Sequence, residues 1–383
     1  MSVSANFKIA NILEGKVMQK PKILVTGASG KTGSAAAAQL LKEGYPVRAM
    51  VHRIDARSER LKAAGAEVVC GSMEDMVDMR ANMKGVQRAY FCPPLTPGTL
   101  RKAAFFGTAA EEAKLEAVVV LSQWVSDPVH PATHSREKWL TNKLLNWIPG
   151  VGVITVNPGF FADNYMAALE PAAQFGILGL PLGHGLNAPP SNEDIGRVIA
   201  AALINPGPYI GGSFRPTGPA LLSPEDIAAT FAKVLGRKVK YQNAPLKLFL
   251  KVAKSLKISD FVIEELYWFL QDYQRNSFGV GAPTDVVEVV AHAKPEDFET
   301  ILRRYVAAGD VRQTVGNKMR AMANMMKAMA TSAPDPERIA RRLELPRIEH
   351  SILAADSDEW HSRHGAGSSV RTGRMHATAK TAG

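Results

Sequence analysis

The chain has 383 residues, a length that suits one large α/β domain with a smaller domain or a tail. Its composition, with 46% hydrophobic and 21% charged residues, is that of a soluble globular protein. The 46 basic and 36 acidic residues give a net charge of +10, but no Lys/Arg-rich block concentrates it. Nucleic-acid binding is therefore not expected, and a basic enzyme for phosphorylated cofactors fits better.

Cysteine usage and the N-terminus indicate a cellular compartment. Cys70 and Cys92 cannot build a disulfide framework and lack metal-ligand spacing, so we expect no metal and a reducing environment. No apolar run approaches the roughly 18 to 20 residues that span a bilayer. Residues 1–20 contain Glu14 and several lysines without a long apolar segment, which predicts a short leader and no signal peptide. We expect a cytoplasmic protein without membrane contact.

Residues 21–170 alternate between short apolar runs and helical stretches of about 10 to 15 residues. The runs that predict strands lie at 22–27, 47–52, 66–71, 86–94, 117–122 and 151–161. A helix is predicted over 135–147, between the last two strands. This alternation predicts an α/β fold with a doubly wound parallel sheet, whose ligands bind at the carboxyl ends of the strands.

The texture changes after Pro171. Residues 171–309 begin rich in Gly and Pro and continue as helices, and aromatic side chains concentrate over 246–275. We predict that this portion forms a smaller, mostly helical substrate domain, mixed with the sheet domain, and that 246–275 build a wall of the substrate site.

The last part of the chain divides into two segments. Over 310–345, an apolar stripe recurs at steps of four and three residues, formed by Val315, Met319, Met322, Met326 and Met329. Such a stripe predicts a docking seam, so we expect residues 315–329 to contact the body, a second copy in a homodimer or a protein partner. Residues 346–383 contain few large apolar side chains and predict an extended, disordered tail.

The sequence VTGASGKTG follows the first predicted strand and opens the first helix. Its glycines form a G-x-x-G-x-x-G pattern, in which the backbone approaches a pyrophosphate and a helix N-terminus donates N–H groups to it. The predicted cofactor ligands in this loop are Gly27, Ser29, Gly30, Lys31, Thr32 and Gly33. A tight turn without a ligand is the alternative, but the position in the first βα unit favours dinucleotide binding.

The end of the second strand distinguishes NAD from NADP. NAD binders carry an acidic residue there, about 20 residues past the glycines. This chain has His52 and Arg53, with Asp55 only beyond them. We predict that His52 and Arg53 contact the cofactor and that Arg53 pairs with a 2′-phosphate, so NADP(H) is preferred over NAD(H). A solvated arginine at a strand exit is the alternative.

Several motifs between residues 22 and 308 together resemble the NmrA-like family of atypical short-chain dehydrogenases/reductases. They are GASGKTG, VRAMVHR, GAEVVCGSMED, GVQRAYFCPP, VVLSQ, NPGFFADN, EDIGRVIAAAL and PEDFETILRRYV. The resemblance implies a Rossmann-type domain that binds NADP(H) and a small C-terminal domain. It also implies either reduction of a quinone-like or other carbonyl substrate, or sensing of the NADP redox state through a protein partner.

Some positions depart from the family pattern. Relatives often have Gly-Asp-Leu after the third strand, where the Asp contacts adenine, and here Ser72 takes that position. The turn after the sixth strand begins with Asn where relatives have Arg, but it keeps Pro158, and Pro93 follows the fourth strand; both prolines are expected near the cofactor. The helix after the fifth strand keeps the family's Lys at Lys138 but has Asn142 in place of a Glu.

Active short-chain reductases use Ser, Tyr and Lys, the last two spaced Y-x-x-x-K, because the Lys orients the nicotinamide ribose and lowers the Tyr pKa. Here Ser122 ends the fifth strand and His134-x-x-x-Lys138 occupies that frame. We predict that Lys138 binds the ribose hydroxyls, that His134 donates a proton and that Ser122 holds a substrate carbonyl. The alternatives are that Lys138 and His134 are ordinary surface residues and that the Ser122 hydroxyl caps the loop after the strand.

Two functions remain open from the sequence. The first is an NADPH-dependent oxidoreductase that passes hydride to a quinone, carbonyl or conjugated acceptor, a small apolar or aromatic substrate. The second is a non-catalytic NADP(H)-sensing regulatory protein that acts through a protein partner. The aromatic segment favours the first function, and the missing tyrosine favours the second.

Overall fold

The computed structural model describes residues 20–365, so the predicted leader before Lys20 and residues 366–383 of the predicted tail lie outside it. Seven parallel strands form the main sheet in the order β3-β2-β1-β4-β5-β6-β8. They are β1 (Ile23–Val25), β2 (Val47–Val51), β3 (Glu67–Cys70), β4 (Arg88–Phe91), β5 (Ala117–Leu121), β6 (Gly152–Val156) and β8 (Ser213–Phe214). The order confirms the predicted doubly wound sheet.

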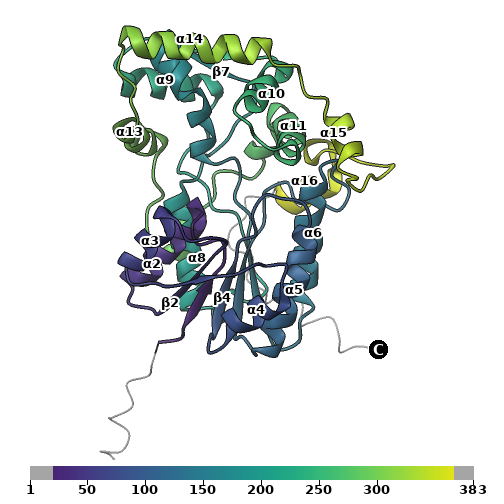
Figure 1. Cartoon of the computed structure of the whole chain (residues 1–383). Coiled ribbons are helices and arrows are strands. Elements are labelled where there is room, and N and C mark those ends of the chain that lie inside the picture. Colours follow the sequence, from purple (N-terminus) through teal and green to yellow (C-terminus); the bar gives the residue numbers. More distant parts are fainter. Residues whose placement is uncertain (1–19, 366–383) are drawn as a thin grey trace, which may run out of the picture.

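Helices cover both faces of this sheet (Figure 1). One face carries α2 (Lys31–Lys42), α3 (Ala56–Ala63), α8 (Asn192–Ile204) and α12 (Val286–Ala291). The other face carries α4 (Met76–Met83), α5 (Thr99–Glu112) and α6 (Thr133–Asn146). Each face has its own apolar core, so the strands between them are apolar on both sides. The three residues of β1, for example, are fully buried.

A second, mostly helical part lies beyond the carboxyl ends of the strands (Figure 1). It contains η1 (Ala162–Ala168), α7 (Leu169–Phe175), β7 (Ile177–Leu180), α9 (Pro224–Leu235), β9 (Lys240–Asn243), α10 (Leu246–Ser255), α11 (Asp260–Gln274), η3 (Ser277–Gly279), α13 (Phe298–Ala308), α14 (Val315–Ala330) and α15 (Pro336–Arg342). The short η2 (Gly207–Tyr209) belongs to the sheet domain instead, where Tyr209 packs against one of its two cores. Strands β7 and β9 pair in parallel as a separate sheet. The core of this part is rich in aromatic side chains, which include Phe160, Tyr165, Phe231, Tyr273, Phe278 and Phe298.

Helix α14 crosses the end of the molecule farthest from the main sheet (Figure 1). Its predicted apolar stripe faces solvent, since Val315 and the four stripe methionines are between 42% and 78% exposed. The small side chains of Ala321 and Ala328 are buried instead, on the side that packs against α7 and α10. The prediction that the stripe docks on the body is therefore wrong. A contact with a second copy or a protein partner stays a prediction.

Residues 346–365 are folded, which corrects the predicted disorder of this segment. They form η4 (Ala354–Asp356) and α16 (Asp358–His364), and the Trp360 side chain is fully buried. The Arg215 guanidinium lies 3.2 Å from the Trp124 ring centroid and 5.6 Å from the Trp360 ring centroid. The segment is held to the body by this aromatic and cationic cluster, because cation–π contacts strengthen when they are desolvated.

The structure was searched for helices that could cross a membrane and for clusters of side chains that could bind a metal ion. Over residues 20–365, no helix has both the length and the apolar character to cross a membrane. The same residues contain no group of three or more His, Cys, Asp or Glu side chains placed to hold a metal ion. Cys70 and Cys92 are free thiols.

Candidate functional site

The loop between β1 and α2 is closely packed and suits only glycine at two positions. Gly27 has a φ of +59°, and a Cβ there would lie 2.4 Å from the Cys92 carbonyl oxygen. A Cβ on Gly33 would lie 2.3 Å from the Gly27 carbonyl oxygen. Among the described residues, no side chain caps α2, so its first-turn N–H groups remain available to an anion. The loop therefore fits a pyrophosphate group.

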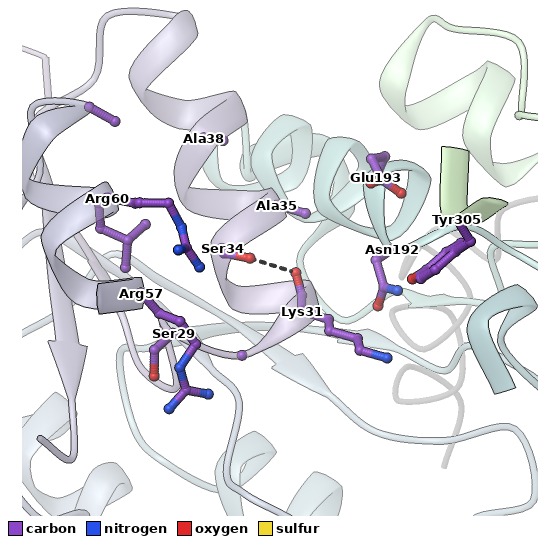
Figure 2. A pocket seen from close by; sticks show the side chains of 13 residues that line it. Ser29, Lys31, Ser34, Ala35, Ala38, Arg57, Arg60, Asn192, Glu193 and Tyr305 are labelled. Carbon is purple, nitrogen blue, oxygen red and sulfur yellow. Dashed lines mark hydrogen bonds between the residues drawn. The ribbon is translucent and has the colours of Figure 1, made fainter. Parts of the chain in front are cut away.

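The side chains of this loop have partners of their own. The Thr32 hydroxyl is buried and accepts a hydrogen bond from the Tyr90 hydroxyl at 3.4 Å. The Lys31 ammonium pairs with the Asp163 carboxylate in η1, which is only 5% exposed. In Figure 2, the Lys31 side chain accordingly extends away from Ser29. The predicted contact of Lys31 with the cofactor is thus left to its backbone N–H group.

A cavity of about 590 Å³ lies beside the loop, between α2, α3, α8 and α13 (Figure 2). Two basic side chains of α3, Arg57 and Arg60, line it together with Ser29, Gly30 and Lys31 of the loop. The sequence analysis did not single out these arginines. The sequence feature that could have indicated them is a pair of basic residues three positions apart in the helix that follows the second strand.

The residues between β2 and α3 include one acidic side chain, Asp55, which already has partners within the protein. Arg53 is exposed, and its side chain lies 3.8 Å from the Asp55 carboxylate. Asp55 caps α3 by accepting hydrogen bonds from the backbone N–H groups of Arg57 and Ser58. The side chain and backbone of Arg57 lower the pKa of Asp55 to about 2. Asp55 is thus engaged as a helix cap, while His52 and Arg53 face solvent.

Ser72 follows β3 and is engaged in a turn. Its backbone N–H donates to the Asp78 carboxylate at 2.8 Å, and its hydroxyl oxygen accepts from the backbone N–H of Glu74 at 3.1 Å. The predicted contact between Ser72 and adenine stays a prediction.

A second cavity, of about 280 Å³, lies at the carboxyl ends of β4, β5 and β6. It brings together five residues that the sequence analysis placed near the nicotinamide: Pro93, Ser122, His134, Lys138 and Pro158. Leu266 and Phe269 of α11, and Phe161, supply an apolar wall. The predicted substrate wall over residues 246–275 therefore includes side chains that line this cavity.

Lys138 is not a surface lysine, since it is only 4% exposed. Its ammonium donates a hydrogen bond of 2.7 Å to the Leu121 carbonyl oxygen at the end of β5. Burial lowers the pKa of Lys138 to about 8, and Cys92, Glu265 and Glu137 partly offset this effect. An ammonium has three N–H donors, so two remain for a ligand in the cavity.

Ser122 is held from two sides. Its backbone N–H donates to the Val156 carbonyl oxygen at 2.8 Å, and its hydroxyl oxygen accepts from the Asn142 side-chain amide at 2.8 Å. The hydroxyl hydrogen is left to donate to a ligand. Asn142, which departs from the family pattern, therefore orients Ser122.

His134 is buried, and its Nδ1 lies 3.3 Å from the Thr99 hydroxyl oxygen. Burial holds the pKa of His134 well below its usual value, and the charges of Lys138 and Lys102 lower it further. The imidazole is therefore neutral near pH 7. A neutral imidazole is a weak acid, so this environment conflicts with the predicted role of His134 as proton donor.

The structure adds Gln123 and Glu265 to the cavity wall. The Gln123 amide and the Ser135 hydroxyl each donate to Glu265 Oε1 at 3.4 Å. Burial, together with the charge of Glu264, raises the pKa of Glu265 to about 8. The sequence analysis did not single out Glu265. The sequence feature that could have indicated it is the pair of acidic residues, Glu264 and Glu265, inside an apolar, aromatic helix.

Known proteins resemble the chain in sequence and in fold. The sequence pattern of the NmrA-like family matches residues 19–120 and 154–302. An NAD(P)H azoreductase from Xenophilus azovorans is 30% identical over 220 residues, which make up 57% of this chain and 76% of that protein.

Solved structures of other proteins share the fold, and two of them serve as examples. A NADPH-dependent quinone oxidoreductase from Escherichia coli, in complex with NADPH, has a TM-score of 0.65 and 19% identity, over 74% of this chain and 99% of that one. NmrA, a negative transcriptional regulator in complex with NADP, has a TM-score of 0.63 and 17% identity, over 82% of this chain and 100% of that one. The family match covers more than half of the chain and confirms the resemblance found in the sequence. The chain belongs to the NmrA-like family.

Proposed function

We propose that this protein is an NADPH-dependent reductase that passes hydride to a quinone, a carbonyl or another conjugated acceptor. The observation that carries the proposal is the 280 Å³ cavity, which combines two polar groups, Ser122 and Lys138, with the apolar wall of α11. A pocket that is mostly apolar with a few convergent polar groups suits a small aromatic ligand. The names of the azoreductase and the quinone oxidoreductase point to the same reaction class.

The chain has groups that suit the pyrophosphate, the nicotinamide and the nicotinamide ribose of the cofactor. The Gly27–Gly33 loop and the N-terminus of α2 would hold the pyrophosphate. Pro93 and Pro158 would flank the nicotinamide, and Lys138 would bind its ribose hydroxyls with the two N–H donors that Leu121 leaves. The nicotinamide supplies the hydride when it is bound.

The preference for NADP(H) over NAD(H) rests on the basic side chains after β2. Arg53 is solvent-exposed, and Arg57 and Arg60 line the cavity beside Ser29. Guanidinium groups pair with phosphate through charge-assisted hydrogen bonds. Because Asp55 is engaged as the cap of α3, its carboxylate competes poorly for ribose hydroxyls.

Substrate orientation would come from Ser122. Its hydroxyl hydrogen points to no acceptor within the described residues, so it can donate to a carbonyl oxygen of the acceptor. Leu266 and Phe269 would cover the acceptor and exclude water. Orientation beside the cofactor lowers the barrier because the reactants need not find each other in solution.

The test is NADPH oxidation by the purified protein with a panel of quinones, enones, aldehydes and azo dyes. We expect turnover with at least one acceptor class. Tight NADP(H) binding without turnover of any acceptor would refute the reductase proposal.

That result would favour a second function, a non-catalytic NADP(H)-sensing protein. Two observations support this alternative. His134 stands at the position of the tyrosine in the Y-x-x-x-K frame of active short-chain reductases, and the α14 stripe of Val315 and four methionines faces solvent. A partner of such a sensor would bind the stripe in a way that depends on the cofactor. Its fold also resembles that of a regulator that binds NADP.

A further inference from the structure

The proposed reaction needs a proton as well as a hydride. A quinone becomes a hydroquinone by gaining one hydride, which carries two electrons, and one proton. Short-chain reductases take that proton from a tyrosine, but in this chain the corresponding position is His134. Its buried, neutral imidazole is a weak acid. Another group on the cavity wall must therefore supply the proton, or solvent must.

We propose that Glu265 of α11 is the general acid of the reaction and donates its carboxyl proton to the acceptor oxygen that becomes a hydroxyl. This inference rests on the proposed reductase function. Glu265 lines the same cavity as Ser122 and Lys138, which is the cavity in which the acceptor would bind. Glu265 is only 5% exposed, so bulk water has little access to it.

The surroundings of Glu265 favour the protonated carboxyl at neutral pH. Its Oε1 accepts hydrogen bonds from Gln123 and Ser135, but both are long, at 3.4 Å. Its Oε2 is buried and has no hydrogen-bond partner among the described residues. A carboxylate with one unsolvated oxygen is costly, so the proton stays on until the surroundings change.

Charged groups near Glu265 act in both directions. Glu264, its neighbour on α11, disfavours the carboxylate, whereas Lys138 and Arg136 of α6 attract it. His134 of the same helix is neutral and contributes no charge. The balance raises the pKa of Glu265 to about 8, with burial as the largest cause. This value is close to the working pH, where a general acid is most effective.

The proton that the acceptor gains is the one that Glu265 loses. As hydride reaches the acceptor, the O–H bond of Glu265 breaks and a new O–H bond forms on the acceptor. Glu265 is left as a carboxylate, which the neighbouring Lys138 ammonium stabilises. After the product leaves, a proton from solvent restores the acid.

The test combines kinetics with infrared spectroscopy on the full-length protein. We would measure kcat for menadione reduction by NADPH from about pH 6 to pH 10, a window that brackets the range in which general acids work. For the wild type, kcat should fall above about pH 8 as the acid loses its proton. Glu265→Gln should lower kcat by about 100-fold and reduce this fall, because a glutamine amide cannot donate a proton as an acid. The part of the fall that remains comes from Lys138, whose pKa is also about 8.

Glu264→Gln is the matched control. Glu264 is 3% exposed, accepts a hydrogen bond from the Trp268 indole at 2.8 Å and borders a different cavity. This variant should keep the alkaline fall in kcat but move it to a lower pH, because the charge of Glu264 no longer raises the pKa of Glu265. Glu265→Asp retains an acid on a shorter arm, so it should lower kcat but keep the fall, and it replaces Glu265→Gln if that variant does not fold.

Infrared difference spectra provide a readout that needs no turnover. The wild type should show the carbonyl band of a buried protonated carboxyl, which disappears as the pH rises through about 8 and is absent from Glu265→Gln. Turnover by Glu265→Gln with an unchanged pH profile, or a wild type without this titrating band, would overturn the role of Glu265 alone. Failure of the wild type to reduce any acceptor would overturn the proposed function and this role together.

Discussion

Trp360→Ala tests whether residues 346–365 are part of the folded body. The Trp360 side chain is fully buried, in the cluster that also contains Trp124 and Arg215. A buried Trp removes about 150–250 Å² from water, which at about 25 cal/mol/Å² corresponds to about 4–6 kcal/mol as an upper bound. Measured Trp→Ala losses in protein cores are about 3–5 kcal/mol, and we expect a loss in that range.

The assay is urea unfolding followed by tryptophan fluorescence, combined with limited trypsin digestion. Trp147→Ala is the matched control, because Trp147 is 75% exposed and its loss should change stability by no more than about 0.5 kcal/mol. If only the segment detaches in Trp360→Ala, trypsin should cleave faster at Arg347 and Arg363. If Trp360→Ala had the same urea midpoint and the same trypsin cleavage rate as Trp147→Ala, the docking of this segment would be refuted.

Four further outcomes are expected. Arg57→Ala should raise the Kd for NADPH by about 10-fold or more with little effect on NADH, and equal losses for both in fluorescence titrations would contradict a 2′-phosphate contact. Lys138→Met should weaken the binding of NADPH and NADH alike, and unchanged calorimetric affinities would contradict a ribose contact. Gly33→Ala should destabilise the protein by about 1–3 kcal/mol and weaken cofactor binding, because its Cβ would lie 2.3 Å from the Gly27 carbonyl oxygen; wild-type melting and affinity would be the opposite result. Burial raises the pKa of Glu265 from 4.5 to about 8, so the folded state holds this proton more tightly than the unfolded state does. The free energy of unfolding should therefore fall as the pH rises from about 4.5 to about 8, and urea unfolding at several pH values should show a smaller fall in Glu265→Gln. The same pH dependence in both proteins would contradict the raised pKa.

Local sequence patterns predicted the sheet domain because each part of that pattern has a local physical cause. Apolar runs such as Ile23–Val25 become buried strands, and the spacing of Gly27, Gly30 and Gly33 follows from close approaches within one loop. Strand β8 was missed because it has only two residues and exists through pairing with β6. No periodicity can be read from so short a run.

The C-terminal errors have a common cause, which is that burial there depends on distant parts of the chain. Docking on the body was one of the partners predicted for the methionine stripe of α14, but the close contact with α7 and α10 uses Ala321 and Ala328. Small side chains allow helices to approach closely, and a count of apolar spacing gives them little weight. Trp360 is one large apolar residue in a polar segment, and only the distant Trp124 and Arg215 give it a place to pack.

The candidate site was predictable where residues follow a strand end or a fixed spacing. Ser122 and Lys138 were placed by the frame of the short-chain reductases, and both line one cavity. Glu265 lies 142 residues from Gln123 in the sequence, and only the fold brings α11 to the loop that follows β5. The neutral state of His134 likewise depends on burial, which the spacing of residues 134 and 138 does not reveal.

Hydride transfer within the assembled complex tests the central claim most directly. The protein would be loaded with NADPH without oxygen and mixed rapidly with menadione, while NADPH absorbance is followed through one turnover. We predict a loss of NADPH that requires the protein and that is slower in Lys138→Met and in Glu265→Gln. A wild-type protein that holds its NADPH unchanged in the presence of quinones, enones, aldehydes and azo dyes would contradict the reductase function.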